Sequence, residues 1–329
     1  MNILITSAAR KVTLVQAFQK ALKDEKLDGF VVAADMSPNS PALKFAAASV
    51  LLPPTEDEDE YNSALLGTCG IMGVDLIIPT RDEELPFYAR HKHEYLKLGI
   101  WIAVPDETCV SLCQDKIAFA DFCEANGVEI PKRIHDITRL PVFVRARYGW
   151  GGGMARRADT MAEVAILKRK WGECLVQENI DAPEYTVDVF SDSRANVLSV
   201  IPRQRIKVVA GESVVGRTEK NADIIRECQR LAGILKLQFH SIIQCFYDNG
   251  VVKFIEVNPR YGGASNLSFR AGGESPRWLI QLVAGREVTA PPVGEFLDNL
   301  TMLRYSQDIF IHPDDKQDDQ SDTQERPSG

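Results

Sequence analysis

Short apolar runs alternate with helix-like patterns over the first hundred residues of the chain. Between two of these runs, apolar side chains recur at every fourth residue, at Leu14, Phe18 and Leu22. Strands that alternate with helices in this way are typical of a parallel α/β sheet. The expected strands are residues 2–6, 30–34, 49–52, 75–79 and 100–104.

Polar residues follow several of these runs, where the carboxyl ends of parallel strands meet and where ligands of such sheets bind. The turn after the first run, residues 6–11, lacks the Gly-x-Gly-x-x-Gly pattern that lets a backbone approach a pyrophosphate. A dinucleotide-dependent dehydrogenase is therefore disfavoured. The polar candidates at these strand ends are Ser7, Arg10, Asp35, Arg81, Asp82 and Glu84.

The segment 251–260 begins as an apolar strand and ends in polar side chains. Because side chains alternate between the two faces of a strand, Glu256 and Asn258 are expected on one face. Pro259 lacks a backbone N–H and is expected to end the strand, and Arg260 follows at the same edge. A capped surface hairpin without a ligand is the alternative interpretation.

Residues 241–247 are expected to pair with this strand across a three-residue loop, residues 248–250. A loop of three residues turns Gln244 toward the face of Glu256 and Asn258, whereas a loop of two would turn it away. Three oxygen donors, only one of them charged, suit Mg²⁺ that keeps some waters and is completed by substrate phosphates.

Two further features indicate phosphate binding. A strand at 142–145 runs into a glycine-rich stretch at 148–154, whose backbone N–H groups could close over phosphates as a lid, with Arg145 beside them. No Gly-Lys-Ser/Thr follows, so this is not a P-loop. Asp115 is expected to cap a helix that begins at Lys116, where a nearby anion would relieve repulsion by the positive helix end. A ligand-free hairpin tip and a solvated lysine are the alternatives.

The second half of the chain predicts more strands and one amphipathic helix. Glu178 and Glu184 flank a short turn between two of these strands. The expected strands are residues 174–180, 184–190, 197–201 and 204–209, and the helix has its apolar face between 224 and 235.

Taken in chain order, these features resemble the ATP-grasp superfamily. The most specific part is Glu256-Val-Asn258-Pro-Arg260, and the glycine-rich stretch is less specific. More narrowly, the chain is similar to stand-alone proteins related to the large subunit of carbamoyl phosphate synthase, over about residues 1–300.

The resemblance implies an α/β fold of two domains. A Rossmann-like parallel-sheet domain precedes an ATP-grasp domain of two α+β subdomains, one carrying the nucleotide lid and one the metal ligands. The implied ranges are 1–110, then 111–312 with subdomains at about 115–180 and 184–312, and a disordered acidic tail at 313–329.

The resemblance also implies roles for individual residues. Gln244, Glu256 and Asn258 are expected to hold two Mg²⁺ ions, for which Mn²⁺ can substitute. Arg145 and Arg260 are expected to be catalytic, with Arg260 stabilising the phosphorylated intermediate. Arg145 departs from the lysine common in the superfamily, and His240 stands where glycine is frequent, which affects the shape of the substrate pocket.

The expected ATP contacts divide into phosphate, adenine and ribose groups. Residues 177–180 are expected at the adenine and Glu184 at the ribose. Arg10, Glu84 and Arg205 are candidates for contacts with the second substrate. The full set expected to bind ATP is Lys116, Arg145, Gly149, Gly151, Gly152, Gln177, Glu178, Asn179, Ile180 and Glu184.

The activity that the resemblance implies is an ATP-dependent carboxylate–amine ligase, an enzyme that forms C–N bonds. It would activate a small carboxylate as an acyl phosphate, couple it to an amine and release ADP and phosphate. Two alternatives stay open: a bicarbonate-activating enzyme like carbamoyl phosphate synthase, and a non-catalytic nucleotide-binding regulatory protein.

The composition of the chain limits the classes of binding partner that are expected. The net charge is −8 and no basic run occurs, which argues against nucleic acid. No stretch of about 18 apolar residues is present, so no membrane partner is expected. Seven cysteines without a Cys-x-x-Cys pair fit reduced thiols in the cytoplasm. A homodimer is an open alternative to a monomer.

Overall fold

The computed structural model describes residues 1–149 and 153–312. The predictions made for Gly151, Gly152 and the tail at 313–329 lie outside the described residues.

The first part of the chain forms the predicted parallel sheet, with strand order β3-β2-β1-β4-β5. All neighbouring pairs in this sheet are parallel. The chain moves outward from β1 in one direction and then returns to its other side, so the carboxyl ends of β1 and β4 form the switch point where ligands of such sheets bind. The strands are β1 (Asn2–Ile5), β2 (Val31–Asp35), β3 (Ala48–Leu51), β4 (Val74–Ile78) and β5 (Trp101–Ile102).

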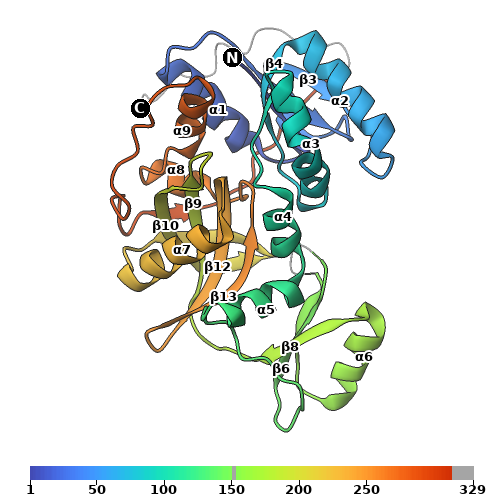
Figure 1. Ribbon diagram of the computed structural model, residues 1–329, viewed down its shortest axis with the longest axis vertical. Helices are drawn as coiled ribbons and strands as arrows, with labels where there is room; N and C mark the ends of the chain where they lie inside the picture. The colour runs from blue at the N-terminus through green and yellow to red at the C-terminus, as the bar shows by residue number, and fades with distance from the viewer. Residues whose placement is uncertain (150–152, 313–329) are drawn as a thin grey trace.

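Helices cover both faces of this sheet, as Figure 1 shows. Alternate residues of a strand point to opposite faces, so Ile3 and Ile5 pack in one hydrophobic cluster and Leu4 in another. The first face is covered by α1 (Val12–Asp24) and α9 (Ser275–Val283), and the second by α2 (Glu58–Met72) and α3 (Leu85–Lys97).

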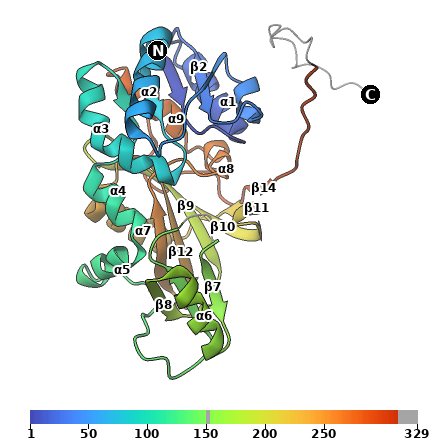
Figure 2. The same ribbon diagram turned by 90° about the vertical axis from the view of Figure 1, so that its right-hand side faces the viewer.

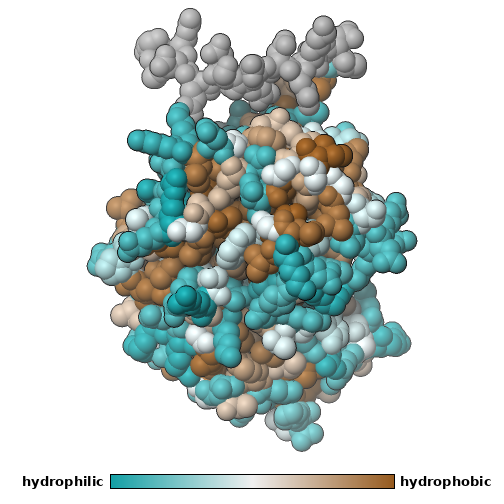
Figure 3. All heavy atoms as spheres, turned by 45° about the horizontal axis from the view of Figure 1, so that its top comes forward, coloured by the Kyte–Doolittle hydropathy of each residue, from teal (hydrophilic) through white to brown (hydrophobic). Residues whose placement is uncertain are grey.

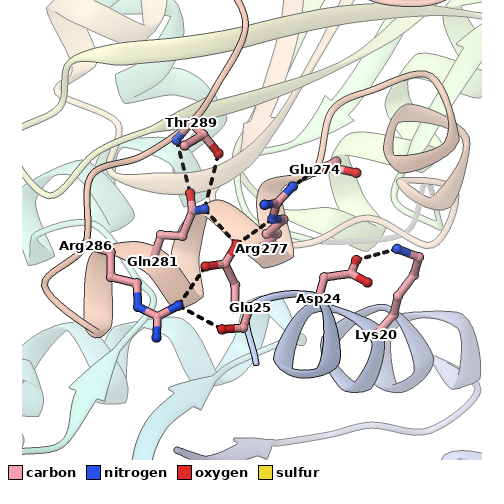
Figure 4. A network of polar contacts seen from close by, with 8 residues as sticks. All are labelled: Lys20, Asp24, Glu25, Glu274, Arg277, Gln281, Arg286 and Thr289. Atoms are coloured by element: carbon pink, nitrogen blue, oxygen red, sulfur yellow. Dashed lines mark hydrogen bonds and ion pairs between the residues drawn. The ribbon is translucent and has the colours of Figure 1, made fainter. Parts of the chain in front are cut away.

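A polar network fastens α1 to the distant helix α9 (Figure 4). Glu25, just after α1, accepts hydrogen bonds from Arg277 Nε at 2.5 Å and Gln281 Nε2 at 2.8 Å. It also forms an ion pair with Arg286 at 3.0 Å. The side chain of Glu25 is 7% exposed, and its carboxylate is fully engaged. The network therefore joins the first sheet to a segment about 250 residues later in the chain.

A small antiparallel sheet, in the order β7-β6-β8, lies at the opposite end of the molecule from the first sheet (Figures 1 and 2). Helix α6 (Met161–Trp171) begins with a capping box between Thr160 and Glu163 and packs Val164 and Leu167 against the sheet. The strands are β6 (Val142–Ala146), β7 (Ala155–Ala158) and β8 (Cys174–Glu178), of which β7 was not predicted.

The largest sheet has six strands in the order β13-β12-β9-β10-β11-β14 and lies between the other two. Helix α7 (Ala222–Leu235) packs its predicted apolar face on it. The two strands expected at 197–201 and 204–209 are one continuous strand, β10, so that prediction was wrong. The strands are β9 (Glu184–Ser191), β10 (Val197–Val209), β11 (Glu212–Thr218), β12 (Phe239–Asp248), β13 (Val251–Asn258) and β14 (Thr301–Leu303).

The register of the β12–β13 hairpin also differs from the prediction. Asp248 pairs with Val251, so the loop has two residues, Asn249 and Gly250, instead of three. Both loop residues have positive φ, 51° and 85°, as a type I′ turn requires. That loop alone would turn Gln244 away from the polar face, but a register shift next to Gln244 restores the face.

The shift is a bulge on β13. Cys245 pairs with Phe254 and Gln244 pairs with Glu256, so Ile255 is the extra residue. The predicted grouping of Gln244 with Glu256 is therefore correct, although the loop length from which it was argued is not.

The remaining elements connect these sheets. Helices α4 (Glu107–Gln114) and α5 (Lys116–Ala125) link the first sheet to the small one, and α8 (Asn266–Arg270) follows β13. The 3₁₀ turns are η1 (Pro41–Lys44) and η2 (Asp82–Glu84). Within the described ranges, no helix combines the length and apolarity needed to cross a bilayer. Figure 3 shows hydrophobic patches interspersed with hydrophilic residues on the face seen there.

Candidate active site

The middle of β12 and the end of β13 bring the three proposed metal ligands together. Asn258 Nδ2 lies 3.3 Å from Glu256 Oε1 and 3.5 Å from Gln244 Oε1. Glu184, at the start of β9, joins them, because Gln244 Nε2 donates to its Oε1 at 3.0 Å. The group has two carboxylates and two amides, and among residues 1–149 and 153–312 no group of three or more His, Cys, Asp and Glu forms a metal site. Hard oxygen donors of this kind fit Mg²⁺.

Arg145 from β6 closes one side of this group. Its side chain is 5% exposed and donates to Glu256 Oε2 at 2.6 Å and to the Ile255 carbonyl at 2.7 Å. Burial acts to raise the pKa of Glu256, but the charges of Arg145 and Lys116 hold this pKa below its ordinary value. The bulge at Ile255 thus exposes the carbonyl that orients Arg145, and Glu256 stays ionised.

The predicted helix cap at Asp115 is confirmed. Its carboxylate accepts from the backbone N–H groups of Ile117 and Ala118, both at 3.0 Å, and α5 begins at Lys116. Lys116 Nζ donates to the carbonyl of Gly149 at 2.6 Å. Burial lowers the pKa of Lys116, and the nearby Arg145 adds to this lowering.

Asp115 also holds the start of the glycine-rich stretch. Arg147 Nε and the Tyr148 hydroxyl donate to its Oδ2 at 2.8 and 3.0 Å. Gly149 has φ of +140°, and a Cβ at this position would come within 3.0 Å of the Met154 sulfur. A side chain at position 149 would therefore strain the backbone and crowd Met154.

The residues proposed to line the adenine differ in how far they are buried. Gln177 is 3% exposed and donates to the Pro131 carbonyl at 2.8 Å, so its side chain has a structural role. Glu178 accepts from Lys253 Nζ and from the Lys132 backbone, both at 3.0 Å. The next two residues, 179 and 180, are half-buried and follow the end of β8.

Of the three substrate candidates, only Arg205 lies beside the metal-ligand group. Its Nε is 3.2 Å from Glu184 Oε1 and its Nη1 donates to Thr186 Oγ1 at 3.2 Å. Arg10 is 82% exposed and pairs with Glu212 at 3.2 Å.

Asp82 and Arg260 meet at the edge of the first sheet, and Glu84 follows Asp82 in the same 3₁₀ turn. Glu84 is 5% exposed and accepts from Thr6 Oγ1 at 3.1 Å and from Ser7 Oγ, and burial raises its pKa. Arg260 forms a two-pronged pair with Asp82, at 2.8 and 2.5 Å. The strand-end residues of the first sheet thus contact the Glu-x-Asn-Pro-Arg segment directly.

A buried polar network under Arg260 was missed in the sequence. Asp188 of β9 pairs with Arg203 of β10 and with His240 Nε2 at 3.1 Å. His240 Nδ1 lies 2.9 Å from Ser275 Oγ, and its ring stacks on Tyr261 at 4.1 Å. The available signal was Asp188, a charged residue between the apolar Val187 and Val189 of β9. His240 therefore supports the backbone that carries Arg260.

Replacing Asp188 by Ala is expected to lower the free energy of unfolding by about 3–5 kcal/mol, because Arg203 would stay buried without its partner. Urea unfolding measures this change. The exposed Asp28→Ala is the matched control, expected to change stability by no more than about 0.5 kcal/mol. Equal stability of the two variants would contradict the network's role.

Two family models match the chain. Residues 3–103 match "PylC-like, N-terminal domain", and residues 170–302 match "ATP-grasp in the biosynthetic pathway with Ter operon". The resemblance to the ATP-grasp superfamily is shown by the family model that matches residues 170–302. The parallel-sheet domain followed by an ATP-grasp domain with antiparallel sheets agrees with this resemblance.

The curated relatives of this chain include carbamoyl phosphate synthase large chains. That of Methanosarcina barkeri is 26% identical over 259 residues, which cover 74% of this chain and 21% of the relative. That of Methanoculleus marisnigri is 25% identical over 215 residues, which cover 57% of this chain and 20% of the relative. The chain thus spans about a fifth of the length of these relatives.

Solved structures with the same fold include enzymes of several activities. Biotin carboxylase from Campylobacter jejuni has a TM-score of 0.72 at 17% identity, covering 91% of this chain and 74% of that one. An L-amino acid ligase from Bacillus licheniformis has a TM-score of 0.66 at 20% identity, and the match covers 88% of this chain and 75% of the ligase. At these identities the likeness shows the ATP-grasp fold alone.

Proposed function

We propose that this ATP-grasp protein is an ATP-dependent ligase that activates a small carboxylate as an acyl phosphate and couples it to an amine. The observation that supports this most is the single group in which Gln244, Glu256 and Asn258 face the cations Arg145 and Lys116. Oxygen donors beside buried cations are what a polyphosphate with bound Mg²⁺ needs.

The proposed nucleotide site extends from this group toward β8. Lys116 and Arg145 would bind the phosphates, and Glu184 would bind the ribose hydroxyls. The backbone of residues 177–180 would line the adenine, since the Gln177 side chain is engaged with Pro131. The lid proposed for the glycine-rich stretch is anchored at its first residues by Asp115.

Gln244, Glu256 and Asn258 would hold Mg²⁺. When bound, the ions supply positive charge to the phosphoryl oxygens. Arg145 would release part of its contact with Glu256 to reach a phosphate, and Glu256 would then be free to bind metal through both oxygens.

The proposed reaction has two displacements. An oxygen of the substrate carboxylate attacks the γ-phosphorus of ATP, and the bond to the β–γ bridging oxygen breaks to release ADP. The amine then attacks the acyl carbon, the C–N bond forms, the bond to the phosphate oxygen breaks, and the amine loses a proton to solvent. Arg260 would stabilise the charge of the phosphorylated intermediate, and a closed site would exclude water from it.

Two other functions are the alternatives. Carbamoyl phosphate formation in that family uses two phosphorylations, whereas the described residues supply one ATP-grasp constellation. A purely regulatory nucleotide-binding protein would have little reason to keep all three proposed metal ligands, and all three are present.

The test is ADP release measured across pairs of amino acids, with bicarbonate and ammonia included. Pair-dependent ADP release with a condensed product, detected by mass spectrometry, supports the ligase. Release that depends on bicarbonate supports the carbamoyl phosphate alternative. ATP binding without turnover in any mixture contradicts the proposed ligase and supports a binding protein.

A further inference from the structure

Lys11 lies at the switch point of the first sheet, between β1 and α1. Its backbone N–H donates to the Ala8 carbonyl at 2.7 Å, and its own carbonyl accepts from Leu14 N at 3.0 Å, so its position is fixed. The residue is half-buried. Among the described residues, its ammonium group forms no hydrogen bond or ion pair with a side chain.

Carboxylates lie near Lys11, but each one is already engaged with other groups. Both oxygens of Asp82 accept from Arg260. The two oxygens of Glu212 accept from Arg10 and Arg304, at 3.2 and 2.7 Å.

Glu84 is engaged in the same way, because its two oxygens accept from Thr6 and Ser7. Asp82, Glu84 and Glu212 all act on the charge of Lys11, yet none pairs with it. Lys11 is therefore a cation that none of these three carboxylates neutralises by direct pairing.

Burial and a second cation, Arg260, both act against the charge of Lys11. Burial, and then the charge of Arg260 from the end of β13, lower the Lys11 pKa to about 8, while Asp82, Glu84 and Glu212 act in the opposite direction. An added anion would raise this pKa again. Ser7 and Ala9, in the preceding turn, have positive φ of 47° and 42°, which costs energy and is typical of ligand-binding turns.

We propose that Lys11 forms, next to Arg260, a binding subsite for a carboxylate group of a substrate. This inference rests on the proposed ligase function, because Arg260 is the residue assigned there to the phosphorylated intermediate. The carboxylate belongs either to the acid that is activated or to the amine substrate. Lys11 would hold and orient that group and would not take part in proton transfer.

The kinetic test compares Lys11→Gln and Lys11→Arg with the wild type, using the substrate pair found by ADP release. Lys11→Gln should raise KM for one carboxylate substrate about 10- to 100-fold, with KM for ATP unchanged, because a charge-assisted hydrogen bond is lost. Lys11→Arg should restore most of the affinity. The substrate whose KM changes identifies the source of the carboxylate.

The pH dependence gives a signature that a structural role would not produce. As pH rises through about 8, Lys11 loses its proton, so KM of the wild type for that substrate should rise. In Lys11→Arg the same KM should stay constant, since arginine remains charged. Lys23→Gln, at an exposed lysine in the last turn of α1, is the matched control and should behave as the wild type.

A binding measurement separates failure of the subsite from failure of the ligase function. In protein labelled with ¹³C-lysine, the Lys11 signal is assigned by its loss in Lys11→Arg and titrated with L-alanine, succinate and, as controls, L-alaninamide and chloride. A higher Lys11 pKa with a carboxylate than with either control supports the subsite even without turnover. A response to none of them, or an unchanged KM for every carboxylate substrate in Lys11→Gln, overturns it.

Discussion

Glu256→Gln is expected to lower turnover by about a thousandfold or more while leaving weak ATP binding. Glu256 is the charged member of the proposed ligand set on β12 and β13, and its pKa is held low, so it is ionised at neutral pH. An amide of the same shape can keep one of the two hydrogen bonds that Glu256 accepts, but it removes the charge that would attract Mg²⁺. The measurement is ADP release with saturating substrates at several Mg²⁺ concentrations.

The substitution also removes the charge opposite Arg145, so stability has to be measured with activity. Removing one partner of a buried ion pair can cost about 3–5 kcal/mol, although the glutamine oxygen can still accept from Arg145. The matched control is Glu219→Gln, a half-buried glutamate at the end of β11 that accepts from the Tyr185 hydroxyl. Near-normal turnover of a folded Glu256→Gln protein would remove the metal site from the proposal.

Arg145→Ala is expected to lower turnover by about a hundredfold and to raise KM for ATP. A cation directed at the transferring oxygens contributes both to ATP binding and to the transition state. Arg145→Lys should recover much of the activity, because lysine keeps the charge, although it cannot contact Glu256 and the Ile255 carbonyl with a fork of two donors.

The pH profile distinguishes this role from simple loss of packing. Arg145 is the largest influence that lowers the Glu256 pKa, so without it burial should raise that pKa. Glu256 would then become protonated at a higher pH, and the acid limb of the activity profile should move upward. The depressed pKa also stabilises the fold above about pH 4.5, and this stabilisation is lost as pH falls through the folded pKa.

Unchanged ATP kinetics in Arg145→Ala would place the phosphates elsewhere. A lower rate with an unshifted acid limb would mean that Arg145 acts on ATP without controlling Glu256. Both measurements use the full chain, with unfolding by urea as the check that each variant is folded.

Local patterns in the sequence determined the parallel sheet, the cap at Asp115 and the polar face of β13. These features depend on alternation, helical spacing and side chains that bond to their own backbone, which are properties of short segments. The sequence also determined that Glu256 and Asn258 share a face, because they are two residues apart in one strand.

Long-range packing decided the rest. The two-residue turn follows from the positive φ of Asn249 and Gly250, but the bulge at Ile255 that returns Gln244 to the polar face has no local signal. The bulge affects the pairing with β13 only, since β12 pairs with β9 without a register shift.

The sequence also could not show which charged groups pair with each other. Arg260 could be read as an anion-binding residue, yet its partner Asp82 lies 178 positions away, and Arg145 and Glu256 are 111 apart. Which cation is neutralised and which, like Lys11, is left for a ligand depends on distances between sheets. Those distances are fixed only when the hydrophobic faces of all three sheets are buried together, so the sequence alone determined the candidate groups and the tertiary structure decided their partners.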